Sequence, residues 1–296
     1  MTDTETLAIQ KLDDQYRAVS LNPRDAIPSE IYHYTSAAGL VGILQSGQLR
    51  ASNFNYLNDA SEIHHGRTLV AKIISERLEA EQPSTHRHVL GRVQRTLEDV
   101  GHDREFYLAC FCTKRDLLSQ WRGYGSTKAR FCIGFNIEEL PRKGLPYRFK
   151  AVEYKRDKQR SKIDRIIQPA MAALGKSDIE RSDEFVNRVA HSLTERLVGE
   201  FVFFKDWSFL DERELRAVHP FDSTADDVLF DVSSGFVRPY VVIWVGKMDT
   251  KGQRRLPVTE ITVFDKRAVR SVELLLSECG YRDVTVRPST VPYQEL

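Results

Sequence analysis

Two short stretches of the chain hold the side chains whose types and spacing could support chemistry. The first, YHYTSAAGLVGILQSGQLRASNFNYLNDASEIHHG at residues 32–66, combines histidine, threonine, serine and tyrosine side chains with an acidic pair. The second, KDWSFLDERELRAV at residues 205–218, contains two glutamates separated by one residue. A histidine can exchange a proton near neutral pH, and paired carboxylates can divide acid and base roles. Together the two stretches are candidates for the two halves of one active site.

Each polar residue of the first stretch also has a structural explanation. His33 alternates with two tyrosines on a predicted strand, so Thr35 shares its face. Ser36 has the type expected of a helix N-cap, and Asp59 with Glu62 has the spacing of a capping box. A histidine on such a strand is either a structural residue or an active-site residue. Both interpretations remain open at this point.

The second stretch places three charges close together. If Glu212, Glu214 and Arg216 lie on a strand, their side chains share one face. Neighbouring carboxylates repel each other, so the cluster is either a solvated edge compensated by the arginine or a catalytic carboxylate supported by a second one. Trp207 and Phe209 precede the cluster, and aromatic residues in a loop favour a binding role.

The elements that must position these residues are short strands interrupted by helices. The predicted helices cover residues 1–20, 36–47, about 60–80, 86–100, two segments within 160–200, and 266–280. The predicted strands cover 31–35, 49–52, 106–113, 129–137, 147–155, 214–219, 239–246, 257–264 and 283–287. Strands and helices do not alternate regularly, which favours an α+β fold over a doubly wound sheet. We predict an N-terminal helix and connector at residues 1–28 and a single domain at residues 29–296.

Composition narrows the class of protein without identifying a function. The charges nearly cancel, with 43 basic and 42 acidic residues, so there is no global field that would attract nucleic acid. The basic segment KAVEYKRDKQRSKIDR at residues 150–165 is explained either as a nucleic-acid contact or as a solvated strand end and helix start. No apolar run is long enough to cross a bilayer, and the polar N-terminus is not a signal peptide. We therefore expect a cytoplasmic protein without a membrane partner.

Two further features could suggest cofactor sites. The four cysteines, Cys110, Cys112, Cys132 and Cys279, are best explained as free thiols in a reducing compartment, and we predict no metal site. The segment LLSQWRGYGSTKARFCIGF lacks the spacing of a phosphate-binding loop. It is interpreted as a turn that leads into the strand at residues 130–135, with Gln120, Trp121 and Tyr124 as candidate pocket residues.

The ordered motifs HYTS, GIL.SG.L.AS, YLND..E, QWRGYG, W…ERELR and VRPSTVPY resemble a bacterial domain family of unknown function that occurs in phage-defence and toxin systems. The resemblance covers residues 31–294. The first block and the E-x-E sequence also resemble ADP-ribosyltransferases. That resemblance implies a curved, split, mostly antiparallel β-sandwich with peripheral helices, which grips NAD in a cleft as a co-substrate and needs no metal.

The resemblance also implies roles for individual residues near the cofactor. His33 matches the histidine that orients the ribose and carboxamide of NAD, with Thr35 as its companion. Tyr56 matches the aromatic residue that stacks on nicotinamide, and Ser52 is an alternative polar position on the second strand. His33, Tyr56 and Glu214 are therefore expected to converge on one cleft.

The carboxylates take the remaining roles in this resemblance. Glu214 matches the group that stabilises the oxocarbenium-like transition state, and Glu212 matches the group that prepares the acceptor. The chain departs from the family pattern because histidine-type members usually carry a single terminal glutamate, and this departure leaves the acceptor open.

The implied function is transfer of ADP-ribose to a macromolecule, RNA, DNA or protein, by a toxin or anti-phage effector with a possible antitoxin or chaperone partner. Two alternatives remain. One is a non-catalytic module that senses a nucleotide or a phage product, and the other is an RNA 2′-phosphotransferase.

Overall fold

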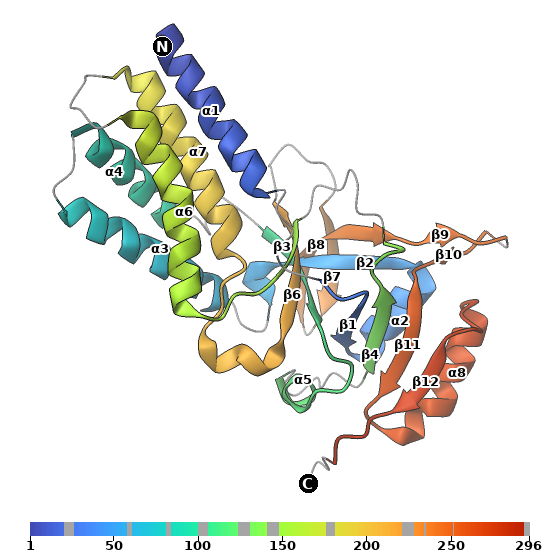
Figure 1. Cartoon of the computed structure of the whole chain (residues 1–296). Helices are drawn as coiled ribbons and strands as arrows, with labels where there is room; N and C mark the ends of the chain where they lie inside the picture. Colours follow the sequence, from blue (N-terminus) through green and yellow to red (C-terminus); the bar gives the residue numbers. More distant parts are fainter. Residues whose placement is uncertain are drawn as a thin grey trace. The chain divides into compact units, whose positions relative to one another are not determined.

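The computed structural model describes residues 1–20, 27–57, 61–80, 84–99, 106–123, 131–140, 148–175, 181–220, 228–233, 235–250 and 252–292. The chain divides into two compact units, each assembled from three separate segments (Figure 1). Unit 1 comprises Met1–Ala26, Asp59–Glu105 and Glu153–Ser208, and unit 2 comprises Ile27–Asn58, Phe106–Val152 and Phe209–Leu296. The sequence predicts one domain from residue 29 onward. The structure differs because the helices of unit 1 bury a core of their own, which periodicity alone does not distinguish from helices packed on a sheet.

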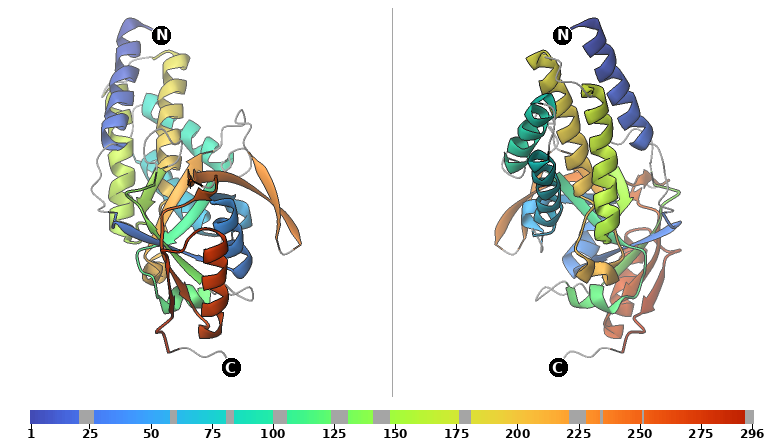
Figure 2. Two further views of the ribbon diagram at one scale, coloured as in Figure 1. Left: turned by 90° about the vertical axis from the view of Figure 1, so that its right-hand side faces the viewer. Right: turned by 60° about the vertical axis from the view of Figure 1, so that its left-hand side comes forward.

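Unit 1 is helical. Its helices are α1 (Asp3–Ser20), α3 (Ser61–Glu79), α4 (Ser84–Asp99), α6 (Arg156–Leu174) and α7 (Asp183–Phe201). Helix α7 packs against the other four, and α1, α6 and α7 run side by side in both views of Figure 2. Its fully buried side chains recur at every fourth position, namely Phe185, Val189, Leu193, Leu197 and Phe201. This spacing forms an apolar stripe along α7, around which the unit is packed.

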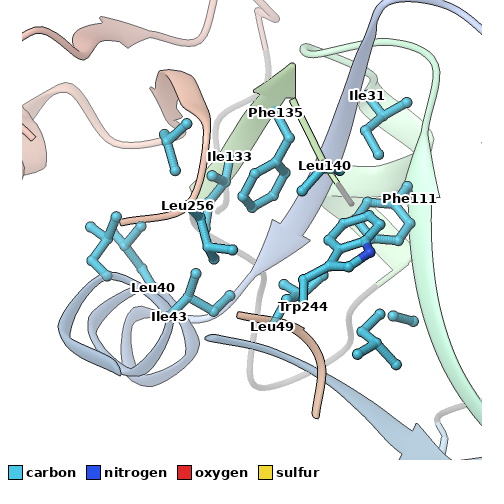
Figure 3. Packing of buried hydrophobic residues seen from close by; sticks show 14 of the residues in the cluster. Ile31, Leu40, Ile43, Leu49, Phe111, Ile133, Phe135, Leu140, Trp244 and Leu256 are labelled. Carbon is cyan, nitrogen blue, oxygen red and sulfur yellow. The ribbon is translucent and has the colours of Figure 1, made fainter. Parts of the chain in front are cut away.

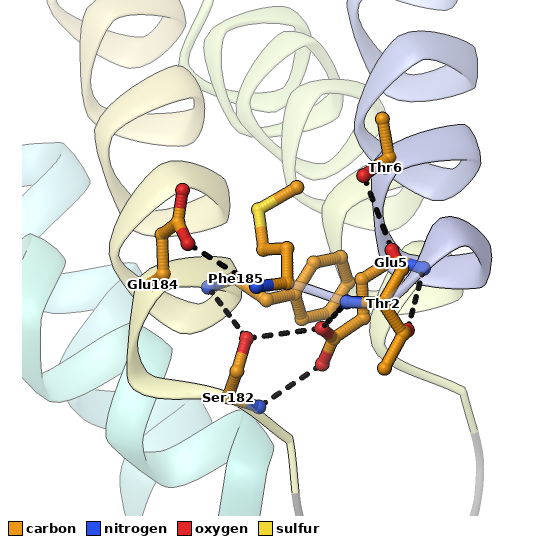
Figure 4. A network of polar contacts seen from close by, with 7 residues as sticks. Thr2, Glu5, Thr6, Ser182, Glu184 and Phe185 are labelled. Atoms are coloured by element: carbon orange, nitrogen blue, oxygen red, sulfur yellow. Dashed lines mark hydrogen bonds and ion pairs between the residues drawn. The ribbon is translucent and has the colours of Figure 1, made fainter.

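One buried carboxylate joins the N-termini of α1 and α7 (Figure 4). Within α1, Glu5 accepts a hydrogen bond from the backbone N–H of Thr2, and the Thr2 hydroxyl accepts one from the backbone N–H of Glu5, which is a reciprocal capping box. Ser182, the N-cap of α7, donates to Glu5 through both its backbone N–H and its hydroxyl, at 3.0 Å each. These bonds, chiefly the one from the Ser182 backbone, lower the pKa of Glu5 to about 2. A single charge therefore satisfies donors at two positive helix ends.

The lowered pKa of Glu5 predicts a specific acid sensitivity. Because the folded-state pKa lies below the ordinary value of 4.5, Glu5 contributes stability above about pH 4.5 and loses it as the pH falls towards 2. We expect Glu5→Gln to lower the free energy of unfolding at pH 7 by roughly 1–3 kcal/mol, the typical cost of losing hydrogen bonds to a charged group. Thermal unfolding from pH 2 to 7 should show a smaller acid-dependent loss in this variant. Glu184→Gln, which changes an exposed carboxylate of the same helix end, should behave like wild type, and equal effects of both changes would contradict the assignment.

Unit 2 is built on a mostly antiparallel sheet. Its strand order is β12-β11-β4-β1-β3-β2-β8-β7, and β6 pairs with both β3 and β5. The strands are β1 (Glu30–Thr35), β2 (Gln48–Asn53), β3 (Phe106–Cys112), β4 (Phe131–Asn136), β5 (Arg148–Ala151), β6 (Glu214–Pro220), β7 (Leu229–Ser233), β8 (Phe236–Val245), β11 (Val258–Val263) and β12 (Thr285–Pro288). A separate ribbon is formed by β9 (Lys247–Met248) and β10 (Arg254–Arg255). Among the described pairs, β11–β12 alone is parallel. The predicted α+β class with a mostly antiparallel sheet is confirmed.

Strand β3 is the branch point of this sheet. It pairs with β6 along its whole length, from Phe106 to Cys112. With β1 it shares one residue pair, Tyr32 with Cys112, and with β2 it shares two pairs at its opposite end. The sheet therefore splits between β1 and β2, with β3 belonging to both parts.

The main core of unit 2 covers one face of the sheet (Figure 3). Helices α2 (Ala37–Ser46) and α8 (Val269–Glu278) contribute to it, and the ring of Trp244 lies 5.0 Å from that of Phe111 and 6.3 Å from that of Phe135. Helix α2 follows its sequence signals: the Ser36 hydroxyl accepts from a backbone N–H of the first turn, and Gly47 ends the helix with φ 59°. The opposite face carries a smaller apolar cluster, described below with the site.

Most predicted elements are confirmed within a few residues, and the differences are concentrated in short elements. The segment read as a turn before residue 130 contains helix α5 (Leu118–Gly123), and strands β7, β9 and β10 were not predicted. The four cysteines are free thiols. In the described part of the chain, no helix combines the length and apolarity that crossing a bilayer requires.

Candidate functional site

The register of three strands decides which predicted site residues can meet. Tyr32 of β1 pairs with Cys112 of β3, and Cys112 pairs with Glu214 of β6. These three side chains therefore point to the same face of the sheet. His33, one position further, points to the other face, where its ring lies 5.6 Å from that of the core residue Phe111. The expected convergence of His33 and Glu214 on one cleft is wrong, because strand alternation puts them on opposite faces.

His33 is accommodated as a neutral structural residue. Its Nδ1–H donates to the backbone carbonyl of Cys110 at 2.9 Å, and burial lowers its pKa below the ordinary value of 6.5. Thr35 shares this face, and its hydroxyl lies so close to α2 that a side chain at Gly39 would overlap it. Of the two explanations for the HYT motif, the contacts favour the structural one.

The remaining predicted cofactor residues lie on β2 and just after it. Ser52 pairs with Leu108, which lies on the Glu214 face of β3 but four positions from Cys112. At about 3.4 Å per residue, this separates Ser52 from Glu214 by roughly 14 Å along the strand direction. Tyr56 lies in the short helix η1 (Phe54–Tyr56), and its side chain is 39% exposed. The structure does not bring Ser52 next to Glu214.

Glu214 forms a bidentate ion pair with Arg216 on the same face of β6. Arg216 Nε donates to Glu214 Oε1 at 2.8 Å, and Nη2 donates to Oε2 at 3.0 Å. The exposed fractions are 5% for Glu214 and 0% for Arg216. Two parallel bonds between planar charged groups fix the orientation of the carboxylate. The solvated-edge explanation of this cluster is therefore excluded.

Glu212 does not lie on the strand, which corrects the predicted E-x-E geometry. It ends the short helix η3 (Trp207–Glu212), and Arg213 follows with φ 49° before β6 begins. Arg213 is the single non-glycine residue with positive φ in the described ranges. Such backbone strain in a residue other than glycine is often retained at functional positions. The turn separates the half-exposed Glu212 from the buried Glu214 within three residues.

Helix α5 holds this turn in place. Gln120 Nε2–H donates to the backbone carbonyl of Glu212 at 3.2 Å, and the Cys112 thiol donates to the same carbonyl. The backbone N–H of Thr113 donates to the carbonyl of Arg213 at 3.2 Å. Of the predicted pocket residues, Gln120 therefore acts on the site through backbone contacts, and Tyr124 lies outside the described residues.

Asp116 anchors α5 to the end of the chain. Its carboxylate accepts from the indole N–H of Trp121 at 2.8 Å, from the Ser289 hydroxyl at 2.6 Å, and from the backbone N–H and hydroxyl of Thr290. Burial raises the pKa of Asp116, but the hydrogen bonds from Ser289, Thr290 and Trp121 outweigh it, and the net pKa is lowered. Trp121 also stacks edge-on against Tyr34 in the apolar cluster that contains Cys112 and Cys132. Sequence analysis missed this role of Asp116, because Ser289 and Thr290 lie more than 170 positions away along the chain.

A cleft of about 500 Å³ lies elsewhere in unit 2. It is lined by residues of α2, the β9–β10 ribbon and α8, including Ser46, Arg254 and Glu278. None of the predicted site residues lines it. The strained turn and the buried ion pair fix charged groups in defined positions and contain the predicted carboxylates.

Comparison with known families matches part of the chain. Residues 120–217 match the model of a family described as Protein of unknown function (DUF2971). The match begins within α5 and ends within β6, so it includes Gln120, Trp121 and the whole of the Glu212–Arg216 turn. Comparison with curated proteins and with solved structures found no match. The resemblance to a domain family of unknown function is thus supported for this segment.

The buried ion pair predicts an asymmetric response to mutation. Arg216→Met leaves Glu214 buried without its partner, and we expect it to lower the free energy of unfolding by about 3–5 kcal/mol. Replacing both residues, Glu214→Gln with Arg216→Met, should cost less than Arg216→Met alone, because no buried charge then loses its partner. Urea unfolding of the two single variants and the double variant measures this coupling. Additive losses would contradict a strongly coupled pair.

The lowered pKa of His33 also predicts a loss of stability in acid, but for a different reason from Glu5. Folding favours the charged form of Glu5 and disfavours the charged form of His33. Because the folded state disfavours the protonated imidazole, the unfolded state binds more protons below about pH 6.5, and stability falls as the pH decreases through that value. His33→Asn retains a donor near the Nδ1 position but does not titrate, so its stability should decline less between pH 7 and 5. Denaturant titrations of both proteins at each pH test this, and parallel curves would show that His33 does not contribute.

Proposed function

We propose that the chain is an NAD-dependent ADP-ribosyltransferase that modifies a macromolecule, in the setting of a toxin or anti-phage effector. The observation that carries the proposal is the turn at Glu212–Arg213–Glu214. It presents one partly exposed carboxylate and one oriented, buried carboxylate on either side of a strained residue. The branching of the sheet at β3 is also what an ADP-ribosyltransferase-like fold would contain.

The chemistry assigns the two carboxylates different roles. In the proposed reaction the bond between ribose and nicotinamide breaks, nicotinamide leaves with the bonding electrons, and positive charge develops on the ribose. Glu214 stabilises that charge, and Arg216 holds its carboxylate in one orientation. Glu212, which is more accessible, accepts the proton of the acceptor nucleophile as the new bond to ribose forms. His33 has no part in this scheme because it faces the core.

A specific observation favours a second candidate, a non-catalytic module that senses a nucleotide or a phage product. Both oxygens of Glu214 are bound by Arg216, and the side chain is 5% exposed. A carboxylate with both oxygens already bonded and little exposed surface reaches a substrate poorly. The second candidate therefore retains ligand binding on this face and lacks turnover.

Nicotinamide release from NAD and transfer of labelled ADP-ribose in cell lysate test the proposal. We expect Glu212→Gln to reduce transfer more than NAD hydrolysis, and Glu214→Gln to reduce both by about 10²- to 10³-fold, the usual effect of losing one electrostatic partner of the transition state. Glu138→Gln, which changes an exposed carboxylate of unit 2, is the matched control and should act like wild type. Since Glu214→Gln also disturbs a buried pair, each variant is assayed below its melting temperature.

The outcomes separate the candidates. Digestion of the labelled lysate with nuclease or with protease identifies the acceptor class. Equal activity in all four proteins would show that these carboxylates are not catalytic. Nicotinamide release by none of them, together with measurable nucleotide binding, would favour the sensing module.

A further inference from the structure

A second charged cluster on the Glu214 face of the sheet involves one carboxylate and two arginines. Glu260 of β11 has an exposed fraction of 8%, and its Oε2 contacts both Arg115 Nη1 at 3.4 Å and Arg287 Nε at 3.3 Å. The arginine side chains remain 49% and 55% exposed. Their contacting nitrogens are no more than about 7 Å apart, because each lies within 3.4 Å of the same oxygen. One buried carboxylate thus orients two accessible guanidinium groups.

An aromatic ring lies beside this cluster. Tyr32, Gly134 and Glu260 are consecutive partners across β1, β4 and β11. A Cβ atom at Gly134 would lie 3.1 Å from Glu260 Cγ and 3.3 Å from Tyr32 Cε1. The missing side chain of Gly134 therefore lets the tyrosine ring approach the carboxylate that holds the arginines.

The charges of this cluster favour an anion. Two guanidinium groups share one oxygen of Glu260, so their charge exceeds that of the carboxylate by one. Two other carboxylates lie nearby: Glu30 accepts from the Tyr32 hydroxyl at 3.0 Å, and Asp116, which follows Arg115 in the chain, accepts from Ser289 and Thr290. Both of these carboxylates accept hydrogen bonds from hydroxyl or backbone groups. A guanidinium group presents several N–H donors in a plane and matches the oxygens of a phosphate group.

We propose that Arg115, Arg287 and Tyr32 form a binding site for a nucleoside diphosphate, with the guanidinium groups on the phosphates and the tyrosine ring against the base. Glu260 is the positioning residue, since it contacts both arginines from a buried position. The site lies on the same face as Glu214, and Tyr32 is separated from it by two strand spacings, or about 10 Å. The proposal does not require the transferase chemistry, because free ADP and NAD both contain an adenine base and a diphosphate.

Calorimetric titration of the full chain with ADP, NAD and inorganic pyrophosphate tests this site. We expect Arg115→Gln with Arg287→Gln to weaken ADP and pyrophosphate binding at least tenfold, as expected from the loss of charge-assisted hydrogen bonds. Tyr32→Ala should weaken ADP binding and leave pyrophosphate binding nearly unchanged. Glu260→Gln should weaken both ligands less than the double variant. Tighter binding of NAD than of ADP would identify the dinucleotide as the source of the diphosphate.

The matched control removes two other arginines of unit 2. Arg267→Gln with Arg270→Gln changes the net charge by the same amount, and both side chains are exposed and paired with a carboxylate. Equal weakening of binding by the control and the test variant would overturn the proposed site. Unchanged binding by the test variant would also overturn it. So would a failure of the wild type to bind ADP and pyrophosphate at millimolar concentration.

Two further results keep the test informative. If the double glutamine variant does not fold, Arg115→Lys with Arg287→Lys keeps the charge and removes the planar donor arrangement, and it should still weaken pyrophosphate binding. Binding of ADP that depends on the two arginines, without nicotinamide release from NAD, would support this site and count against the transferase.

Discussion

The alternation of side chains along β3 is the constraint on which the organisation of unit 2 depends. This strand pairs with β1, β2 and β6, so its odd and even positions set the faces of all three neighbours. Side chains on the Phe111 face of the sheet pack into the main core. Side chains on the Cys112 face lie with the buried ion pair and the apolar cluster of Trp121. A shift of one residue in any of these pairings would exchange the two faces, burying the charges in the core and exposing the aromatic rings. The core and the candidate site are thus specified together.

The charged groups on the Glu214 face are held by different kinds of contact at its two ends. Near β6, a bidentate pair buries both partners, and the adjoining turn is fixed through backbone carbonyls that accept from Gln120 and Cys112. Near β11, a single carboxylate leaves its two arginines half exposed. The first arrangement fixes the Glu214 carboxylate rigidly and leaves it little exposed to solvent. The second orients the two guanidinium groups in part and leaves them accessible. A binding surface that extends over both would have a firm end and an adjustable end.

Much of the fold follows from local sequence signals, and the site follows from contacts between distant residues. The Ser36 and Gly47 caps of α2 and the alternating pattern around Cys110 and Cys112 predict their elements correctly because their causes lie within a few residues. The left-handed Arg213 has no such signal, since arginine does not favour that conformation. The sequence therefore does not show that Glu212 lies before the strand of Glu214 and Arg216 instead of on the same face with them.

Other failures have the same origin. Helix α5 is short, and it is held by Asp116 through residues more than 170 positions away. The facing of His33 depends on the register between strands that are separated by more than 70 residues. Strand β7 (Leu229–Ser233) is five residues long and does not alternate regularly, and it was not predicted although Gly235 is a turn signal before β8.

The interleaving of the two units has a consequence for synthesis and dissection of the chain. Three segments of unit 1 alternate with three of unit 2, so cutting the chain at any one junction leaves at least one unit incomplete. A cut after Ser208 keeps all the segments of unit 1 together and separates the last segment of unit 2 from its other two. A nascent chain can therefore finish the helical unit while β6 and every later strand of the sheet are still to be made. The segment that matches the family model, residues 120–217, contains parts of both units and the whole of neither. Expressed as a separate fragment, it would lack both β1, which pairs with β4, and β3, which pairs with β6.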